Sequence, residues 1–191
     1  MKQLLFIFVL ITVFTQCKTG NEFEKEASVI DSTKVVLQVK LNELKRSEQN
    51  LETIGFNKFE IYSTFLHNNL KDTISRSGAS VIQQFINAGN TLKQFEKGKE
   101  ELVKQTELSI AQLQKLSSDV KENNLQPNAI QAFYSGEKNH AEELISAIEQ
   151  NIKALNMSAT SYKSSLPRTE EFIRSINNGN LPIVVQQGET E

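Results

Sequence analysis

One stripe of apolar residues constrains the fold of this chain more than any other feature of its sequence. Its members are spaced alternately four and three residues apart: Ala141, Ile145, Ile148, Ile152, Leu155, Ala159, Tyr162 and Leu166. This is the heptad pattern of helices that pack as in a coiled coil. A helix with such a stripe must bury it against other long helices, from the same chain or from another. A short helix from about Arg168 to Ile176 is expected after Pro167.

Two further segments carry the same kind of pattern. A first helix is expected from about Glu22 to Leu51. Its apolar stripe comprises Ile30, Leu37, Leu41, Leu44 and Leu51, and Val29, Val36 and Val39 are expected to widen it. A later helix is expected from Thr91 to about Glu122, where Asn123-Asn124 and then Pro127 end it.

The chain between residues 58 and 122 has two interpretations. Residues 58–76 carry an aromatic helical face with Phe59, Tyr62 and Phe65. Gly78 and Gly89 follow, and each interior glycine costs a helix ~1 kcal/mol relative to alanine. These glycines could kink one long helix or separate two, and the sequence leaves both open.

The predicted fold is an all-α antiparallel bundle of about four long helices with coiled-coil-like packing. The chain has only three prolines and no tryptophan, and runs of alternating polarity that would indicate strands are nearly absent. Several comparable helices in one chain favour an internal bundle over a multichain coiled coil. The bundle domain is assigned to residues 25–180, and residues 181–191 form a C-terminal tail whose apolar start could lie along the bundle.

The N-terminus has the pattern of a secretion signal. Lys2 precedes an apolar run from Leu4 to Phe14, and the only cysteine of the chain, Cys17, follows shortly after. Eleven helical residues span ~16 Å, whereas a bilayer core is ~30 Å thick. The run therefore fits a signal peptide over residues 1–16 and not a membrane-spanning helix.

The stretch before Cys17 resembles the signal of bacterial lipoproteins, in which a lipid is attached to a cysteine and cleavage follows just before it. The family usually has leucine three residues before the cysteine and then small residues. In this chain the three positions before Cys17 are Phe14, Thr15 and Gln16, a pattern that is similar to the looser signals of the Bacteroidota. The resemblance covers residues 1–18 and implies a lipid anchor on Cys17, with residues 17–24 as lipidated cysteine and tether.

Lys18 resembles the residue that follows the cysteine in lipoproteins passed on to the outer membrane. The implied location is the bacterial cell envelope, at the outer membrane. Two other readings of Cys17 stay open: an incidental residue near an ordinary cleavage site, and part of an uncleaved anchor, which the short apolar run disfavours. A lone cysteine cannot form an intramolecular disulfide, and lipidation explains both its number and its position.

Glu137 and His140 are the weak candidates for a metal site. A Glu-x-x-His pair puts a carboxylate and an imidazole on one helix face, and ferritin-like di-iron bundles use this pair twice. It occurs once here, because His67, the other histidine, has no glutamate three residues before it. The competing interpretation is two polar residues on a solvated turn, and we expect neither a metal nor another cofactor.

The remaining chemistry of the sequence favours a function other than catalysis. The chain lacks a phosphate-binding GxxxxGK loop, an HExxH pair and a GxSxG elbow. Its net charge is −2, which disfavours a nucleic-acid partner. We expect an interaction or structural module that is not an enzyme, held on a membrane by the lipid and contacting an envelope protein; its oligomeric state is left open. The alternatives are a ligand-binding or sensing bundle with a groove at the aromatic segment, and a metal-dependent enzyme.

Overall fold

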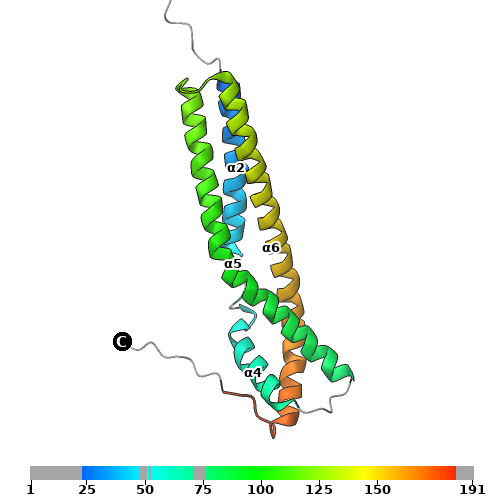
Figure 1. Cartoon of the computed structure of the whole chain (residues 1–191). Coiled ribbons are helices and arrows are strands. Elements are labelled where there is room, and N and C mark those ends of the chain that lie inside the picture. Colours follow the sequence, from blue (N-terminus) through cyan, green and yellow to red (C-terminus); the bar gives the residue numbers. More distant parts are fainter. Residues whose placement is uncertain (1–22, 48–50, 52, 71–75, 184–191) are drawn as a thin grey trace, which may run out of the picture. The chain divides into compact units, whose positions relative to one another are not determined.

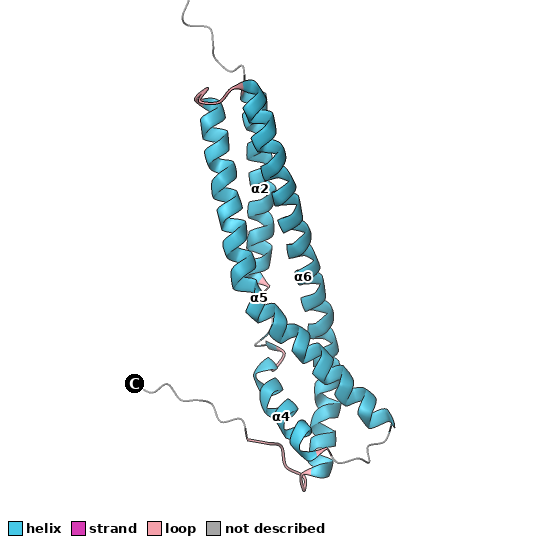
Figure 2. Cartoon of the chain, viewed as in Figure 1, coloured by secondary structure: helices cyan, strands magenta, loops and turns pink. Residues whose placement is uncertain are grey.

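The computed structural model describes residues 23–47, 51, 53–70 and 76–183, and all regular structure within them is helical (Figures 1 and 2). The elements are α2 (Glu24–Arg46), the short 3-10 helix η2 (Phe56–Lys58), α4 (Phe59–Asn69), α5 (Arg76–Lys121) and α6 (Pro127–Ile176). The predicted all-α helical bundle is confirmed. The first helix begins close to its predicted start, and the described residues end α2 at Arg46.

The described residues form two compact units, and α2, α5 and α6 each contribute residues to both. The first unit contains the chain up to Gln38 and Glu107–Glu143. Its three helical segments lie side by side, with α5 running opposite to α2 and α6 (Figure 1). Its core holds aliphatic side chains: Ala27, Ile30, Leu37, Leu113, Leu116, Val120, Ile130 and Ala141.

The second unit contains Val39–Thr106 and residues from Leu144 onward. Its core differs from that of the first unit because it is built around aromatic rings. The buried cluster joins Phe59 and Tyr62 of α4 with Phe85 of α5 and Tyr162 of α6. Leu181, at the start of the C-terminal tail, packs against this cluster.

The question left open for residues 58–122 is settled by two separate helices. α4 ends at Asn69, earlier than predicted, and α5 begins at Arg76. α5 then continues without a break through Gly78, Gly89 and Gly98 to Lys121. A helix of 46 residues has enough packed turns to carry the propensity cost of these glycines.

Asparagines in the left-handed conformation end both long helices. Asn123 has φ +55° and Asn178 has φ +51°. In each case the backbone amide of the next residue donates a hydrogen bond to the carbonyl five residues before it. The bond from Asn124 N to Asp119 O is 2.9 Å long, and so is the bond from Gly179 N to Arg174 O. These are Schellman-type ends, in which the left-handed residue turns the chain back over the last carbonyls. The predicted end of the helix at Asn123-Asn124 is thereby confirmed.

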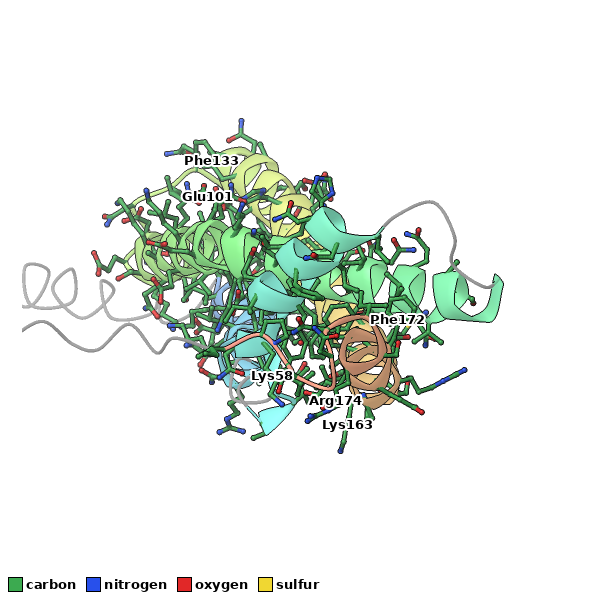
Figure 3. The ribbon with its side chains drawn as sticks, turned by 90° about the horizontal axis from the view of Figure 1, so that it is seen from below. Lys58, Glu101, Phe133, Lys163, Phe172 and Arg174 are labelled. Atoms are coloured by element: carbon green, nitrogen blue, oxygen red, sulfur yellow. The ribbon has the colours of Figure 1, made fainter. Side chains whose placement is uncertain are left out.

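The predicted break of the last helix at Pro167 is wrong, because α6 runs through it as one helix from Pro127 to Ile176. A proline removes one backbone hydrogen bond, here the one to the carbonyl of Lys163. Pro167 and Lys163 are both exposed, and Lys163 points away from α6 in Figure 3, so water can satisfy that carbonyl. Buried Thr169 and Ile173 continue the packed side beyond the proline.

The prediction that three valines widen the buried stripe of the first helix is also wrong. Ile30, Leu37, Leu41 and Leu44 of α2 are buried, whereas Val29, Val36 and Val39 are exposed. Successive residues of an α-helix are turned by about 100°, so Val29 and Val36 lie well to one side of Ile30 and Leu37. α2 therefore carries apolar side chains on two faces, of which one is buried.

Candidate functional site

The aromatic face of residues 58–76, at which the ligand-binding alternative expects a groove, is mostly part of the core. Phe59 and Tyr62 are buried, and Phe56 is half-buried at the edge. The ring of Phe59 stacks on that of Phe56 with centroids 5.7 Å apart, and the rings of Phe85 and Tyr162 lie 5.1 Å apart. Aromatic pairs at such separations add to the stability that burial provides.

The aromatic cluster is closed on one side by the turn before η2. Gly55 has φ +74°, a left-handed conformation that suits glycine, and its carbonyl accepts a hydrogen bond from Tyr162 Oη at 3.2 Å. Burial raises the pKa of the Tyr162 hydroxyl, so it remains a donor at neutral pH. The bond ties the turn before α4 to α6.

A partly exposed carboxylate lies at the edge of the same cluster. Glu170 of α6 accepts bonds from Lys58 Nζ at 2.9 Å and from Tyr62 Oη at 3.1 Å (Lys58 is labelled in Figure 3). Burial, followed by the bond to Glu170, raises the pKa of Tyr62 to about 12. Glu170 thus satisfies the hydroxyl of a buried tyrosine, which is a structural role.

A hollow of about 610 Å³ opens beside this cluster in the second unit. Apolar Leu51 and Phe56 line it together with four charged residues of α4 and α5 and one amide: Asn57, Glu60, Lys93, Glu96 and Lys97. Lys93 and Glu60 form an ion pair across it. An apolar wall beside charges of both signs can hold a small amphipathic zwitterion.

The metal-site candidates are not brought together with further ligands. Glu137 is half-buried and His140 is exposed, both on α6, and His67 is exposed on α4. Across the described residues, no group of three or more histidine, cysteine, aspartate or glutamate side chains could hold a metal ion. The predicted lipidation site, Cys17, lies outside the residues that the structure describes.

The exposed face of α2 carries several apolar side chains. We call it the α2 outer stripe and define it as Lys25, Val29, Ser32, Val36, Val39 and Glu43. All six side chains are exposed, and the three valines keep between 44% and 49% of their surface accessible. Val35, 57% exposed, lies beside the stripe. Three exposed valines on one helix face, with Ser32 between them, form a larger apolar surface than the single exposed apolar side chains that are common on any protein.

In the first unit, a shallow groove of about 580 Å³ runs beside this stripe. Ser28, Ser32, Val35 and Val36 line it. Asp31 and Lys121 stand at its edge and form an ion pair at 2.7 Å, which ties α2 to the end of α5. The bonds to Lys121 and then to Lys34 lower the pKa of Asp31 from 3.8 to about 2, so its charge persists on this edge.

A second apolar recess of about 180 Å³ lies in the first unit between α2 and α6. Val29, Ile30, Ile130 and Tyr134 line its apolar part. The Tyr134 hydroxyl lies 3.0 Å from Thr33 Oγ1, which fixes the two helices at this level. Nearby on α6, Phe133 is exposed and points outward (Figure 3).

Comparison with models of known protein families, with curated proteins and with solved structures finds no match to this chain. Within its described residues, none of the helices combines the length and the apolar character needed to cross a bilayer.

Sequence reasoning missed the α2 outer stripe because it assigned the valines to the core. The sequence of α2 nevertheless contained a signal. Valine and serine lie on the face that is exposed, whereas leucine and isoleucine lie on the face that is buried. The larger side chains mark the buried face. The hollow at Phe56 could not be found from local spacing, because α4 and α5 line it from positions far apart in the chain.

Proposed function

We propose that this protein is a lipid-anchored helical bundle of the bacterial envelope that works as an interaction module, by binding a protein chain through an exposed helix face. The observation that supports this function best is the α2 outer stripe, an exposed row of valines on a helix whose opposite face is already buried. A helix face of this kind binds a partner through burial of apolar surface and needs no catalytic residue.

The anchoring part of the proposal is supported by the N-terminal sequence. Lipidation of Cys17 would place the start of α2 at most ~25 Å from the lipid-bearing residue, the reach of seven extended residues. Lys18 favours delivery to the outer membrane. Acyl chains, and not a basic surface, would hold the protein on the membrane.

The anchor is tested by the intact mass of the mature N-terminal peptide from native membranes. The expected peptide begins at Cys17 and carries a diacylglyceryl group, because the signal would be removed after lipid attachment. A peptide with another start and an unmodified thiol would contradict the anchor. The protein would then be secreted without a lipid, with Cys17 free to form an intermolecular disulfide.

A second candidate function, ligand binding, is supported by the hollow at Leu51 and Phe56. Its mixed charges and apolar wall favour a small zwitterion with an apolar group. A ligand that binds only the folded protein raises its melting temperature, so a thermal-shift screen with such molecules tests this function. The shift should disappear in Lys93→Gln and persist in Lys104→Gln, an exposed lysine of α5 that does not line the hollow.

A further inference from the structure

We infer that the α2 outer stripe pairs with the same stripe of a second copy of this chain, helix against helix and antiparallel. This inference rests on the proposed function, in which the stripe is a contact surface, and it names the partner.

The stripe has the spacing that helix pairing requires. Its six members are four, three, four, three and four residues apart, which is the heptad pattern. They lie on α2, one uninterrupted helix from Glu24 to Arg46, so they form a single row ~27 Å long. The row alternates between the two core positions of a heptad, as a two-stranded coiled coil needs.

The stripe is complementary to itself when read in the opposite direction. Antiparallel pairing brings Val29 opposite Val39 of the second copy and Ser32 opposite Val36. The same two contacts recur by symmetry, as a two-fold axis demands. The two small serines therefore face valines, and the valines that remain face one another, so no charged side chain enters the centre of the contact.

Charge at the two ends of the stripe selects the direction. In the antiparallel arrangement Lys25 meets Glu43 of the second copy, at both ends. A parallel arrangement would instead place Lys25 beside Lys25 and Glu43 beside Glu43, which is unfavourable. Lys25 forms no ion pair with another described residue and so is available for this contact. Glu43 accepts a hydrogen bond from Lys40 at 3.1 Å through one carboxylate oxygen, and Lys25 of the second copy would be its second cationic neighbour.

The flanking residues agree with this direction. Glu26 and Lys40 occupy the same flanking position of the heptad, near opposite ends of α2. Antiparallel pairing brings Glu26 of one copy toward Lys40 of the other, a lysine that also pairs with Glu43 and Glu149 of its own copy. Val35 occupies the other flank near the centre, where it approaches Val35 of the second copy. The flanks thus join unlike charges toward the ends and apolar side chains in the middle.

The chain preceding α2 is a poor alternative occupant of the stripe. After cleavage before Cys17, only residues 17–23 would precede α2, and Lys18 to Glu22 are polar or glycine. Phe23, the one large apolar residue of this stretch, is already half-buried. A second copy supplies what this stretch lacks, a row of apolar side chains with oppositely placed charges.

Disulfide crosslinking between two differently tagged copies of the full chain tests the pairing in membranes. One copy carries Val29→Cys and the other Val39→Cys, and both exposed positions tolerate the change. The mixed pair should form a crosslinked dimer that carries both tags. Two Val29→Cys copies should not, because antiparallel pairing separates these positions by ~15 Å along the axis, beyond the ~7 Å reach of a disulfide between Cα atoms.

A control separates this test from that of the lipid anchor. The unsubstituted chain has only Cys17, so a disulfide-linked dimer of that chain would report a free thiol and count against lipidation. The difference between mixed and same-site cysteine pairs would still report the pairing of α2. Strong same-site crosslinks with weak mixed crosslinks would show parallel pairing and overturn the inference, as would a product that joins one tagged copy to a different protein.

Charge reversal gives a second, independent readout on the same crosslink. Lys25→Glu in both copies should lower the yield of the mixed dimer, because it places a second carboxylate opposite Glu43. Adding Glu43→Lys should restore it. Lys163→Glu, at an exposed position of α6, should leave the yield unchanged. Equal yields for Lys25→Glu and Lys163→Glu, or no rescue by the double change, would overturn the antiparallel register.

Discussion

Gly89 allows α5 to pass directly against the ring of Phe59. A Cβ atom at Gly89 would lie 2.0 Å from Phe59 Cε2, well inside the contact distance. Phe59 cannot move aside easily, since its ring is buried and packs against Phe56 and Phe85. Gly89→Ala should therefore lower the free energy of unfolding by about 1–3 kcal/mol, the usual cost of overpacking a core.

Gly98 provides the matched control on the same helix. A Cβ atom there meets nothing within 4 Å, and the residue is exposed. Gly98→Ala should raise the free energy of unfolding by up to about 1 kcal/mol, because alanine favours the helix more than glycine does. Urea denaturation followed by circular dichroism measures both variants. Equal effects of the two substitutions would contradict the close contact at Gly89.

The ion pairs of Asp31 should make the stability of the protein depend on pH. Asp31 contacts Lys121 at 2.7 Å and Lys34 at 3.0 Å, and its pKa falls from 3.8 to about 2 on folding. The unfolded chain therefore binds the proton first as the pH falls. The stabilisation is complete above the unfolded pKa and is lost as the pH falls through the folded pKa.

Asp31→Asn should lower the free energy of unfolding at pH 7 by about 1 kcal/mol, because these contacts are partly exposed. The difference from the unsubstituted protein should shrink as the pH falls below 3.8 and vanish below about 2. Denaturant titrations at a series of pH values measure it. Asp119→Asn, which removes a pair within one helix, should have a smaller effect at pH 7. A constant difference between Asp31→Asn and the unsubstituted protein at all pH values would exclude the ionised carboxylate as its source.

At the scale of the element, Pro167 lowers the stability of α6 at one point inside the helix. Pro167→Ala should restore the hydrogen bond to the Lys163 carbonyl and raise the free energy of unfolding by about 1–2 kcal/mol, less than the full penalty of ~3 kcal/mol for a helix interior. Thermal unfolding followed by circular dichroism measures the change. Pro127→Ala is the control, since Pro127 begins α6, where the missing amide has no helical partner. A Pro167→Ala variant no more stable than Pro127→Ala would show that proline at this position is not a cost.

α2 shows why apolar periodicity alone could not assign its faces. Leu37 and Val36 are neighbours in the sequence, yet one is fully buried and the other is half-exposed. Both belong to regular heptad rows, so spacing predicts a helix but leaves two rows to choose from. Side-chain size separates them: leucine and isoleucine occupy the buried row, and valine and serine occupy the α2 outer stripe.

At the scale of the whole molecule, the fold class could be predicted because long helices repeat their buried residues at regular intervals. The row from Ala141 to Tyr162 identified α6, and its members Ala141, Ile148, Leu155 and Tyr162 are buried at intervals of seven. Contacts between distant residues left no such local signal. The bond from Tyr162 to the Gly55 carbonyl joins positions 107 residues apart, and neither segment indicates the other.

The candidate surfaces were less predictable than the fold. Cys17 could be identified because its position after an apolar run has a chemical meaning by itself. Glu137 and His140 could be identified but lack further ligands among the described residues. The hollow at Phe56 and the α2 outer stripe needed the tertiary structure, since each depends on what the rest of the chain leaves uncovered.

The polar residues buried on the inner side of α5 affect how the stability of the protein depends on temperature. Thr106, Ser109 and Ser117 are fully buried there, where long aliphatic side chains could have stood. Unfolding such a core exposes fewer carbon atoms to water, and polar exposure offsets part of the heat-capacity increase that carbon exposure causes. These three residues therefore lower the heat-capacity change of unfolding slightly, and the curve of stability against temperature is a little flatter than it would be with long aliphatic side chains at the same positions.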